Sequence, residues 1–378
     1  MSDVIITREP VVNKQRAITA NRLVFHAPNV PAVVEALARY AEQWPTAHTV
    51  FVSLGKLVPT AELLGWQPPE NTLIEIPAPA LQYPQTQELI NQLNASNIPM
   101  ALTWYQPGVK WPENVDCRFV MADANKLPVP TGAPGLAMAW GLKNLDGFKL
   151  AIDQGYDGAA GWFFLHGAPV AKQLASSHAG IVRLLNLVRN EAEVSEIEAA
   201  LKHDVTLSYK LLKYINSAGF GLMVEVQSFR HAVTILGMDK LHKWLSLLLV
   251  SASKDPTAPA VMQASIARGH FMEKLGKHYF DKGELDNLFI TGAFSLLPVL
   301  LGTSLDAVLD QMSLPEPVND ALLRGEGAYA SLLKLAEATE NFLPDALRAQ
   351  TEALGLTNEQ VNEALLESVA FADKLNFN

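Results

Sequence analysis

The chain has 378 residues, of which 49% are hydrophobic, and it carries a formal net charge of −10 at pH 7. This length and apolar content can fill two hydrophobic cores, so we expect two globular domains. The acid excess leaves no basic surface to follow a phosphate backbone and argues against direct nucleic-acid binding. The single cysteine, Cys117, excludes an internal disulfide framework and a zinc site built on paired cysteines.

Membrane insertion and export are not indicated either. No apolar run reaches the ~18 residues that a spanning helix needs. The first ten residues, MSDVIITREP, contain no basic segment followed by an apolar one, as a secretion signal would. We therefore expect a cytoplasmic protein that has no membrane partner.

The first half of the chain alternates short β-rich runs with helical or turn-rich stretches, which predicts parallel βαβ units. Seven runs, with VIIT near the N-terminus as a candidate eighth, favour a (β/α) barrel trimmed below the ~250 residues typical of that fold. Apolar residues at three- and four-residue steps predict helical connectors over 30–43, 86–95 and 145–155. The seven runs are RLVFH, TVFVSL, TLIEI, PMALTW, CRFVMA, GLAMAW and GAAGWFF.

The β signal ends after Pro169, and the remaining sequence is helical in character. This composition shift marks a domain boundary. We expect an α/β barrel over residues 1–170, a connecting helix over 171–193 and an all-helical domain over 194–378. No low-complexity linker separates the two domains.

Residues 194–248 hold short predicted helices separated by glycines. The order of a helix, then DVTLS, LLKYINSAGFG, SFRHAVTILG and KWL resembles HDOD domains, which are all-helical bacterial signalling modules related to the HD phosphohydrolases. The likeness continues over 289–302, 305–340 and 367–375, in the form that follows EAL-type domains. One departure is Val205, where the family usually has proline. The resemblance implies a regulatory helical domain.

The barrel half resembles an EAL domain, the barrel that hydrolyses the bacterial second messenger cyclic di-GMP. GYDGAAGWFFLHGAP (155–169) is similar to the closing segment of that family, and TLIEI is similar to the strand that bears a metal-binding glutamate. The family's reaction requires several carboxylates around two divalent cations, which hold the attacking water and the phosphodiester together.

Most of these functional positions carry other residue types in this chain. By strand order, the first-strand glutamate and arginine of the family fall on Arg22 and His26, while Glu75 is retained on the third strand. An acid-poor barrel mouth cannot hold two hard cations. We therefore expect no catalytic residue, no metal site and no cofactor, and a chain that is not an enzyme. The other family positions fall on Ser53, Thr103, Trp104, Met121, Trp140 and Ala160, with Asp123 retained.

Nucleotide binding without turnover is a separate possibility. Glu75, Trp104 and Trp140 are the candidate ligand-binding residues, and Tyr105 and Trp162 are further aromatic side chains able to stack on guanine. Aromatic residues on barrel strands more often fill the interior or cover its ends, and a lone glutamate there is more often a hydrogen-bonded structural residue. The sequence leaves both interpretations open.

His203-Asp204 is the one His-Asp dipeptide of the chain. In HD phosphohydrolases such a pair binds a metal together with a further histidine and aspartate, for which His178 and Asp255 are the candidates. The local sequence DVTLSYKLL instead predicts that the aspartate caps a helix with an amphipathic face. We favour the cap.

We expect a non-catalytic bacterial regulator that acts through protein–protein interaction with a partner of unknown identity. The runs LLKYI, KWLSLLLV and LLPVLL exceed what a small core obviously needs, which favours a partner groove or a homodimer surface; the alternative is that they are core. Two other functions stay open. One is a cyclic di-GMP receptor whose barrel mouth binds the ligand, and the other is a residual metal-dependent cyclic di-GMP phosphodiesterase.

Overall fold

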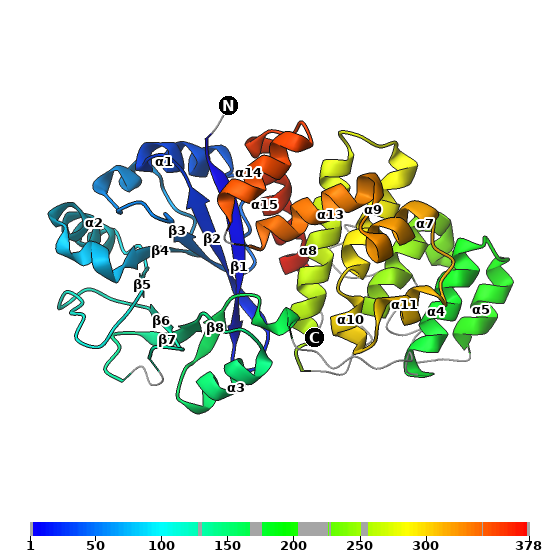
Figure 1. Cartoon of the computed structure of the whole chain (residues 1–378), viewed down its shortest axis with the longest axis horizontal. Helices are drawn as coiled ribbons and strands as arrows, with labels where there is room; N and C mark the ends of the chain where they lie inside the picture. The colour runs from blue at the N-terminus through cyan, green and yellow to red at the C-terminus, as the bar shows by residue number, and fades with distance from the viewer. Residues whose placement is uncertain are drawn as a thin grey trace. The chain divides into compact units, whose positions relative to one another are not determined.

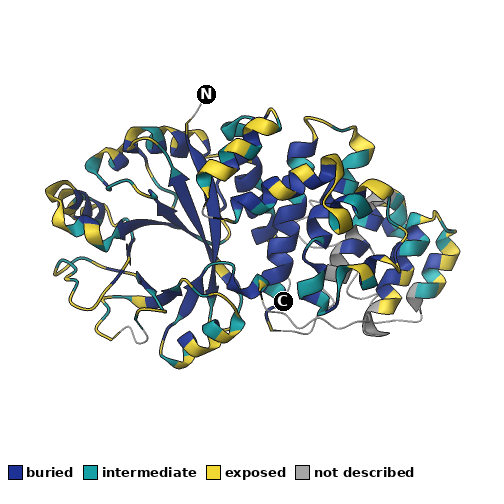
Figure 2. Ribbon diagram, in the orientation of Figure 1, coloured by how far each residue is buried: buried dark blue, intermediate teal, exposed yellow. Residues whose placement is uncertain are grey.

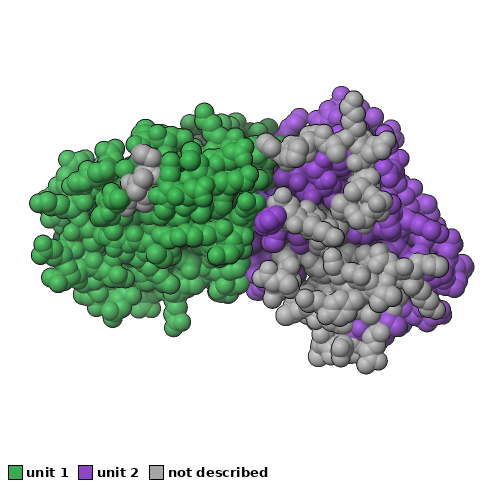
Figure 3. Space-filling model, turned by 90° about the horizontal axis from the view of Figure 1, so that it is seen from below, with its two compact units in different colours: residues 1–167, 337–370 green, residues 168–336, 371–378 purple. Residues whose placement is uncertain are grey.

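The structure is a computed structural model that describes residues 3–127, 131–166, 176–202, 226, 228–250, 256–341 and 343–375. It contains two compact units, drawn in different colours in Figure 3. The first unit comprises residues 1–167 and 337–370, and the second comprises residues 168–336 and 371–378. The first unit is built on a barrel and the described part of the second is helical, so the predicted order of an α/β barrel and a helical region is confirmed (Figure 1).

Eight strands close into a barrel in chain order. Strands β2 to β8 all run parallel to one another. Strand β1 closes the barrel between β2 and β8 and is antiparallel to both. All seven predicted runs form strands, and VIIT leads into the eighth; the antiparallel direction of that strand was not predicted. The strands are β1 (Ile5–Asn13), β2 (Ile18–His26), β3 (Thr49–Ser53), β4 (Thr72–Pro77), β5 (Met100–Thr103), β6 (Phe119–Asp123), β7 (Leu136–Trp140) and β8 (Gly158–Ala160).

Three helices cover the outside of the barrel where the sequence predicts connectors: α1 (Val30–Arg39), α2 (Pro84–Ala95) and α3 (Leu145–Asp153). Each turns an apolar face toward the strands and an exposed face outward (Figure 2). Asn29 caps the first of them by accepting a hydrogen bond from the backbone N–H of Ala32. Short 3₁₀ helices occupy Ala61–Gly65, Ala78–Gln82 and Phe163–Leu165.

The barrel is trimmed, as expected, because no helix joins β5 to β6 across residues 104–118. Its interior is filled by one apolar cluster with contributions from every strand. Because these side chains pack to the axis, the barrel is a closed core and not a pore. The cluster consists of Val11, Ala20, Phe51, Leu73, Ala101, Met121, Met138 and Ala160, with Phe119 and Trp140 packed against it.

Part of the C-terminal region belongs to the unit of the barrel. Asn362, in helix α15 (Asn358–Lys374), is fully buried. Its side-chain oxygen accepts a hydrogen bond from the Ile6 backbone N–H at 2.9 Å, and its amide group donates to the Val4 carbonyl at 3.0 Å and to the Tyr40 hydroxyl at 3.2 Å. This side chain therefore satisfies backbone groups at the start of β1.

Helix α14 (Pro344–Ala353) adds a second attachment to the same unit. Arg348 donates to the carbonyl of Asp3 at 2.8 Å and to the carbonyl of His26 at 3.1 Å. The contacts thus group residues 337–370 with the barrel, whereas the sequence led us to assign all of 194–378 to one helical domain.

The described part of the second unit contains helices and no strand. Helices α8 and α9 cross so closely that a Cβ on Gly292 would lie 2.7 Å from the Cα of Gly269. The crossing therefore needs glycine at this position. The helices are α4 (Ser176–Arg189), α5 (Val194–Lys202), α7 (Phe229–Val250), α8 (Ala258–Gly276), α9 (Lys282–Phe294), α10 (Leu297–Leu301), α11 (Leu305–Leu309), α12 (Glu316–Asn319), the π-helical turn Asp320–Arg324 and α13 (Gly327–Thr339).

Two of the apolar runs that favoured a partner surface are core where the structure describes them. In LLPVLL, Leu296, Leu297 and Leu300 are buried, and in KWLSLLLV, Leu245 and Ser246 are buried. The third run, LLKYI, lies outside the described residues. These five residues therefore belong to the core of the unit, and the partner surface stays a prediction.

His270 makes the helical unit sensitive to acid. Its ring stacks on Phe371 with centroids 4.3 Å apart. Burial, aided by nearby lysines, lowers the pKa of His270 to about 3. An unfolded histidine titrates near 6.5, so between about pH 6.5 and 3 the unfolded state binds more protons and stability falls with falling pH.

The free energy of unfolding should fall less between about pH 7 and 4 in His270→Phe than in the wild type, because the variant lacks the group that the unfolded state protonates. Urea titrations at the two pH values measure it. The exposed His278, substituted by Gln, is the control for the removal of a histidine. Equal pH dependence in His270→Phe and the wild type would contradict the assignment.

Candidate ligand site in the barrel mouth

A buried arginine lies between two glutamates inside the barrel. The Arg22 guanidinium, from β2, donates from Nε and Nη2 to the two carboxylate oxygens of Glu75, at 2.5 and 2.8 Å. Its Nη1 donates to Glu9 at 2.8 Å, and Nη2 also reaches the Ser53 hydroxyl at 3.2 Å. Only 7% of Arg22, 5% of Glu9 and 1% of Glu75 is exposed. The paired fork on Glu75 is the strongest geometry for this pair of groups.

Strand register explains the cluster. Glu9 on β1 lies directly opposite Arg22 in the antiparallel β1–β2 pairing, so their side chains leave the same face of the sheet. Glu75 lies one strand beyond β3, close enough for the long arginine side chain. Glu9 is not among the site residues predicted from the sequence. Its signal is the pair of charged residues inside the otherwise apolar run IITREPVV.

Burial and charge act in opposite directions on these groups. Burial raises the pKa of Glu9, and the neighbouring Arg22 opposes part of that rise. Burial acts to lower the pKa of Arg22, but the carboxylates of Glu75 and Glu9 outweigh it and the net shift is upward. Arg22 is therefore a permanent cation within the barrel.

Two tryptophans stand beside this cluster. Trp140, on β7, packs against the apolar cluster of the barrel interior. Trp104 directly follows β5 and is 50% exposed; its ring lies 4.6 Å from that of Trp140 in an edge-on arrangement. The backbone of Trp104 has a φ of 57°. This left-handed conformation is strained for a bulky residue, and such strain is concentrated at functional sites.

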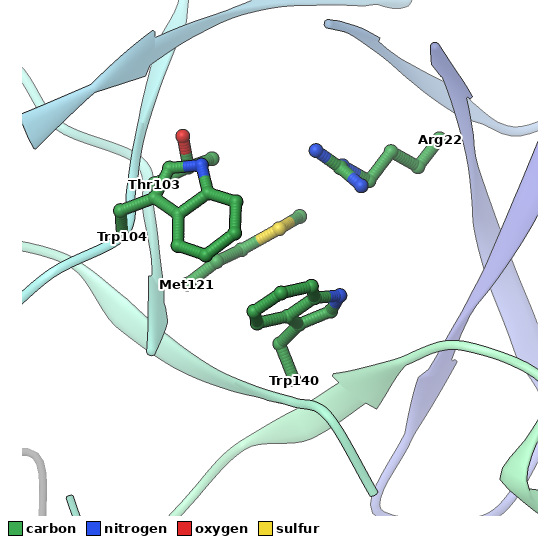
Figure 4. Close-up of a pocket in the computed structure, with 5 residues that line it drawn as sticks. All are labelled: Arg22, Thr103, Trp104, Met121 and Trp140. Atoms are coloured by element: carbon green, nitrogen blue, oxygen red, sulfur yellow. The ribbon is translucent and has the colours of Figure 1, made fainter. Parts of the chain in front are cut away.

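A small pocket of about 20 Å³ opens at the same end of the barrel. Figure 4 shows the two indole rings on one side, Met121 between them and Arg22 extending toward them from its strand. The polar groups of the wall come from Arg22 and Thr103, and the rest is aromatic or thioether surface. The pocket is small, and the half-exposed indole of Trp104 is its accessible aromatic surface. Its lining residues are Arg22, Thr103, Trp104, Met121 and Trp140.

The structure brings together most of the positions aligned from the sequence. Glu75 and Ser53 contact Arg22 below the pocket, so Glu75 is a hydrogen-bonded barrel residue and not part of the pocket wall. Asp123 instead pairs with Lys126. His26 exchanges a hydrogen bond with Thr7, and burial lowers the pKa of His26 to about 4.

The other aromatic candidates lie apart from the pocket wall. Tyr105 is buried. The guanidinium carbon of Arg8 lies 5.3 Å from the ring centroid of Trp162. The indole N–H of Trp162 donates to the backbone carbonyl of Arg8. The aromatic surface of the mouth is therefore formed by Trp104 and Trp140.

The two divalent cations of an EAL-type barrel do not fit these residues. Both acids of the cluster are already bound to a guanidinium. Across the described ranges, no three His, Cys, Asp or Glu side chains gather as metal ligands. His203, Asp204 and Asp255 lie outside the described residues, as does the side chain of His178, so the His-Asp pair stays a prediction.

The chain combines a closed eight-stranded barrel with a segment that is similar to HDOD domains. Residues 174–297 match the HDOD domain family, which confirms that part of the resemblance. The described chain has no helix with both the length and the apolar character needed to cross a membrane.

Two curated relatives share about three fifths of the chain. The cyclic di-GMP phosphodiesterase CdgJ of Vibrio cholerae serotype O1 is 29% identical over 61% of this chain and 54% of its own length. The uncharacterized protein YuxH of Bacillus subtilis is 24% identical over 60% of this chain and 56% of its own. The chain thus spans about half the length of the curated relatives it matches.

Two solved structures are similar over smaller parts. An HDOD domain protein of unknown function from Geobacter sulfurreducens aligns with a TM-score of 0.37 and 15% identity, over 54% of this chain and 94% of its own. The FimX EAL domain from Pseudomonas aeruginosa, bound to c-di-GMP, aligns with a TM-score of 0.33 and 13% identity, over 43% of this chain and 90% of its own.

One expectation is contradicted by these comparisons. The lost carboxylates led us to expect that the chain is not an enzyme, yet the Vibrio cholerae relative is named a phosphodiesterase. That name points to enzymatic function, so the expectation is wrong. Substitutions in the barrel mouth concern one site of a two-unit chain and do not decide the activity of the whole.

Proposed function

We propose that this chain is a regulatory protein of cyclic di-GMP signalling whose barrel is a degenerate EAL domain. The HDOD domain at 174–297 and the relative named a cyclic di-GMP phosphodiesterase support the signalling role. The closed barrel, with an antiparallel first strand and a substituted mouth, supports the degenerate barrel.

In this proposal the barrel mouth binds cyclic di-GMP through one of its guanine rings. The observation that carries it is Trp104, a half-exposed indole held at a strained φ of 57° beside Trp140. The exposed half of the Trp104 indole offers stacking surface for a single base at the barrel mouth. Base–aromatic stacking contributes about 1–3 kcal/mol per base.

Titration of the purified chain with cyclic di-GMP tests this, because both indoles report on the site by fluorescence. We expect saturable quenching in the wild type and at least about tenfold weaker binding for Trp104→Ala, from the loss of one stacking contact. Trp111→Ala is the matched control, since that indole donates to the Val115 carbonyl in the β5–β6 loop. No change in fluorescence at about 1 mM ligand would contradict the receptor.

Product formation is followed in the same samples with Mg²⁺ or Mn²⁺. Turnover abolished by Glu75→Ala would assign the reaction to the barrel mouth. Turnover that survives this substitution would assign it to another part of the chain. Either result measures activity separately from the binding of ligand at Trp104.

A second role is transmission to a protein partner, which the HDOD match favours. We infer that the helical unit carries the signal from the barrel to that partner. Cross-linking of the full chain in native extract, with and without cyclic di-GMP, tests it. A partner retained by the wild type and lost on substitution within the helical unit supports the role, and no specific cross-link in either condition contradicts it.

A further inference from the structure

The guanidinium of Arg22 is surrounded by oxygen atoms of two carboxylates and a hydroxyl. Its N–H groups are directed at four oxygens, two on Glu75, one on Glu9 and the Ser53 hydroxyl. These oxygens come from three strands, β1, β3 and β4, so one group ties together a large part of the barrel wall.

Two carboxylates this deeply buried require a counter-charge. Removing an ionised carboxylate from water costs several kcal/mol unless a cation and hydrogen bonds compensate for it. Carboxylate and hydroxyl oxygens are also the ligands preferred by Mg²⁺ and Mn²⁺. The cluster therefore has the donor set of a hard cation, with an arginine in its centre.

We propose that Arg22 is the resident cation of the barrel mouth. It takes the place that a divalent metal ion would take between Glu9 and Glu75, so the mouth is assembled without metal. Because a guanidinium does not deprotonate or dissociate in a protein, this arrangement is permanent. The site beneath the Trp104–Trp140 pair is then closed to divalent cations in the native chain.

Arg39 provides a matched comparison within the same unit. It also lies between two carboxylates, those of Glu35 and Glu359, but 40% of its side chain is exposed. Water can replace Arg39 as the partner of these acids, and it cannot replace Arg22. Removing Arg22 should create a demand for a cation, whereas removing Arg39 should not.

The experiment compares thermal unfolding of the full chain, Arg22→Gln, Arg39→Gln and the double variant Arg22→Gln/Glu75→Gln, each with EDTA and with about 10 mM Mn²⁺. We expect the wild type and Arg39→Gln to show the same Tm under both conditions. Arg22→Gln should have a lower Tm that rises by several degrees with Mn²⁺. The double variant should lose that rise, because it lacks one of the two carboxylates.

Other outcomes overturn the proposal. A Mn²⁺-dependent rise in the wild-type Tm that Glu75→Gln removes would show that metal binds with Arg22 in place. A folded Arg22→Gln with no response to Mn²⁺ would show that the acids need no cation.

If Arg22→Gln is unfolded in EDTA, recovery of its circular dichroism spectrum by Mn²⁺ supports the proposal, and failure to recover contradicts it. Arg22→Lys, which keeps the charge, should be folded and unresponsive.

Discussion

Replacing Arg22 by methionine is expected to lower the free energy of unfolding of the barrel unit by about 3–5 kcal/mol, the cost of breaking a buried ion pair from one side. Methionine keeps an unbranched apolar stem but lacks the guanidinium, so it leaves Glu9 and Glu75 buried without their common partner. Urea denaturation followed by tryptophan fluorescence measures the change, since Trp104 and Trp140 lie in the same unit.

Two controls separate charge from packing. Arg39→Met removes an exposed arginine from between two acids and should cost less than about 1 kcal/mol. The double variant Arg22→Met/Glu75→Met should recover part of the loss, because Glu9 is then the one carboxylate of the cluster left without its counter-charge. The interpretation fails if Arg22→Met is no more destabilising than Arg39→Met.

Substitution of Asn362 by leucine should destabilise the barrel unit from the far end of the sequence. Leucine is similar in size but cannot accept the hydrogen bond of the buried Ile6 N–H. Each buried backbone group left unpaired costs about 1–3 kcal/mol. Differential scanning calorimetry should show a lower unfolding temperature for the barrel unit than in the wild type.

Asn341→Leu is the control for this prediction, because its side chain is exposed and donates to the Glu337 carbonyl one helical turn away. It should change the free energy of unfolding by less than about 0.5 kcal/mol.

Because Asn362 of α15 binds the start of β1, residues 1–170 expressed alone should be much less stable than the barrel of the full chain. A fragment of equal stability would show that α15 is dispensable.

The sequence predicts the strands well because their signal is local. Seven β-rich runs between turn residues needed no tertiary information, and the positions aligned by strand order, such as Arg22 and Glu75, do meet inside one barrel mouth. What could not be predicted is non-local. Strand β1 is antiparallel because it closes the barrel between β2 and β8, which are far apart in the sequence. Unless the position of β1 is known, Glu9 cannot be predicted to lie opposite Arg22.

The C-terminal helices show the same limit. The amphipathic pattern of α15 predicts a helix but does not say which core it packs on, and the buried Asn362 within it is recognisable only from its contacts with β1. The strain at Trp104 is likewise a backbone property that residue type does not disclose. The apolar run LLPVLL was ambiguous between surface and core until its burial was known.

The most direct test of a metal-independent ligand site in the barrel mouth is calorimetric titration of the full chain with cyclic di-GMP in excess EDTA. Because Arg22 and not a metal ion neutralises Glu9 and Glu75, we expect saturable heat under these conditions, and its loss in Trp104→Ala. The account is contradicted if no heat is detected up to about 1 mM ligand, or if binding appears only when Mg²⁺ or Mn²⁺ is restored.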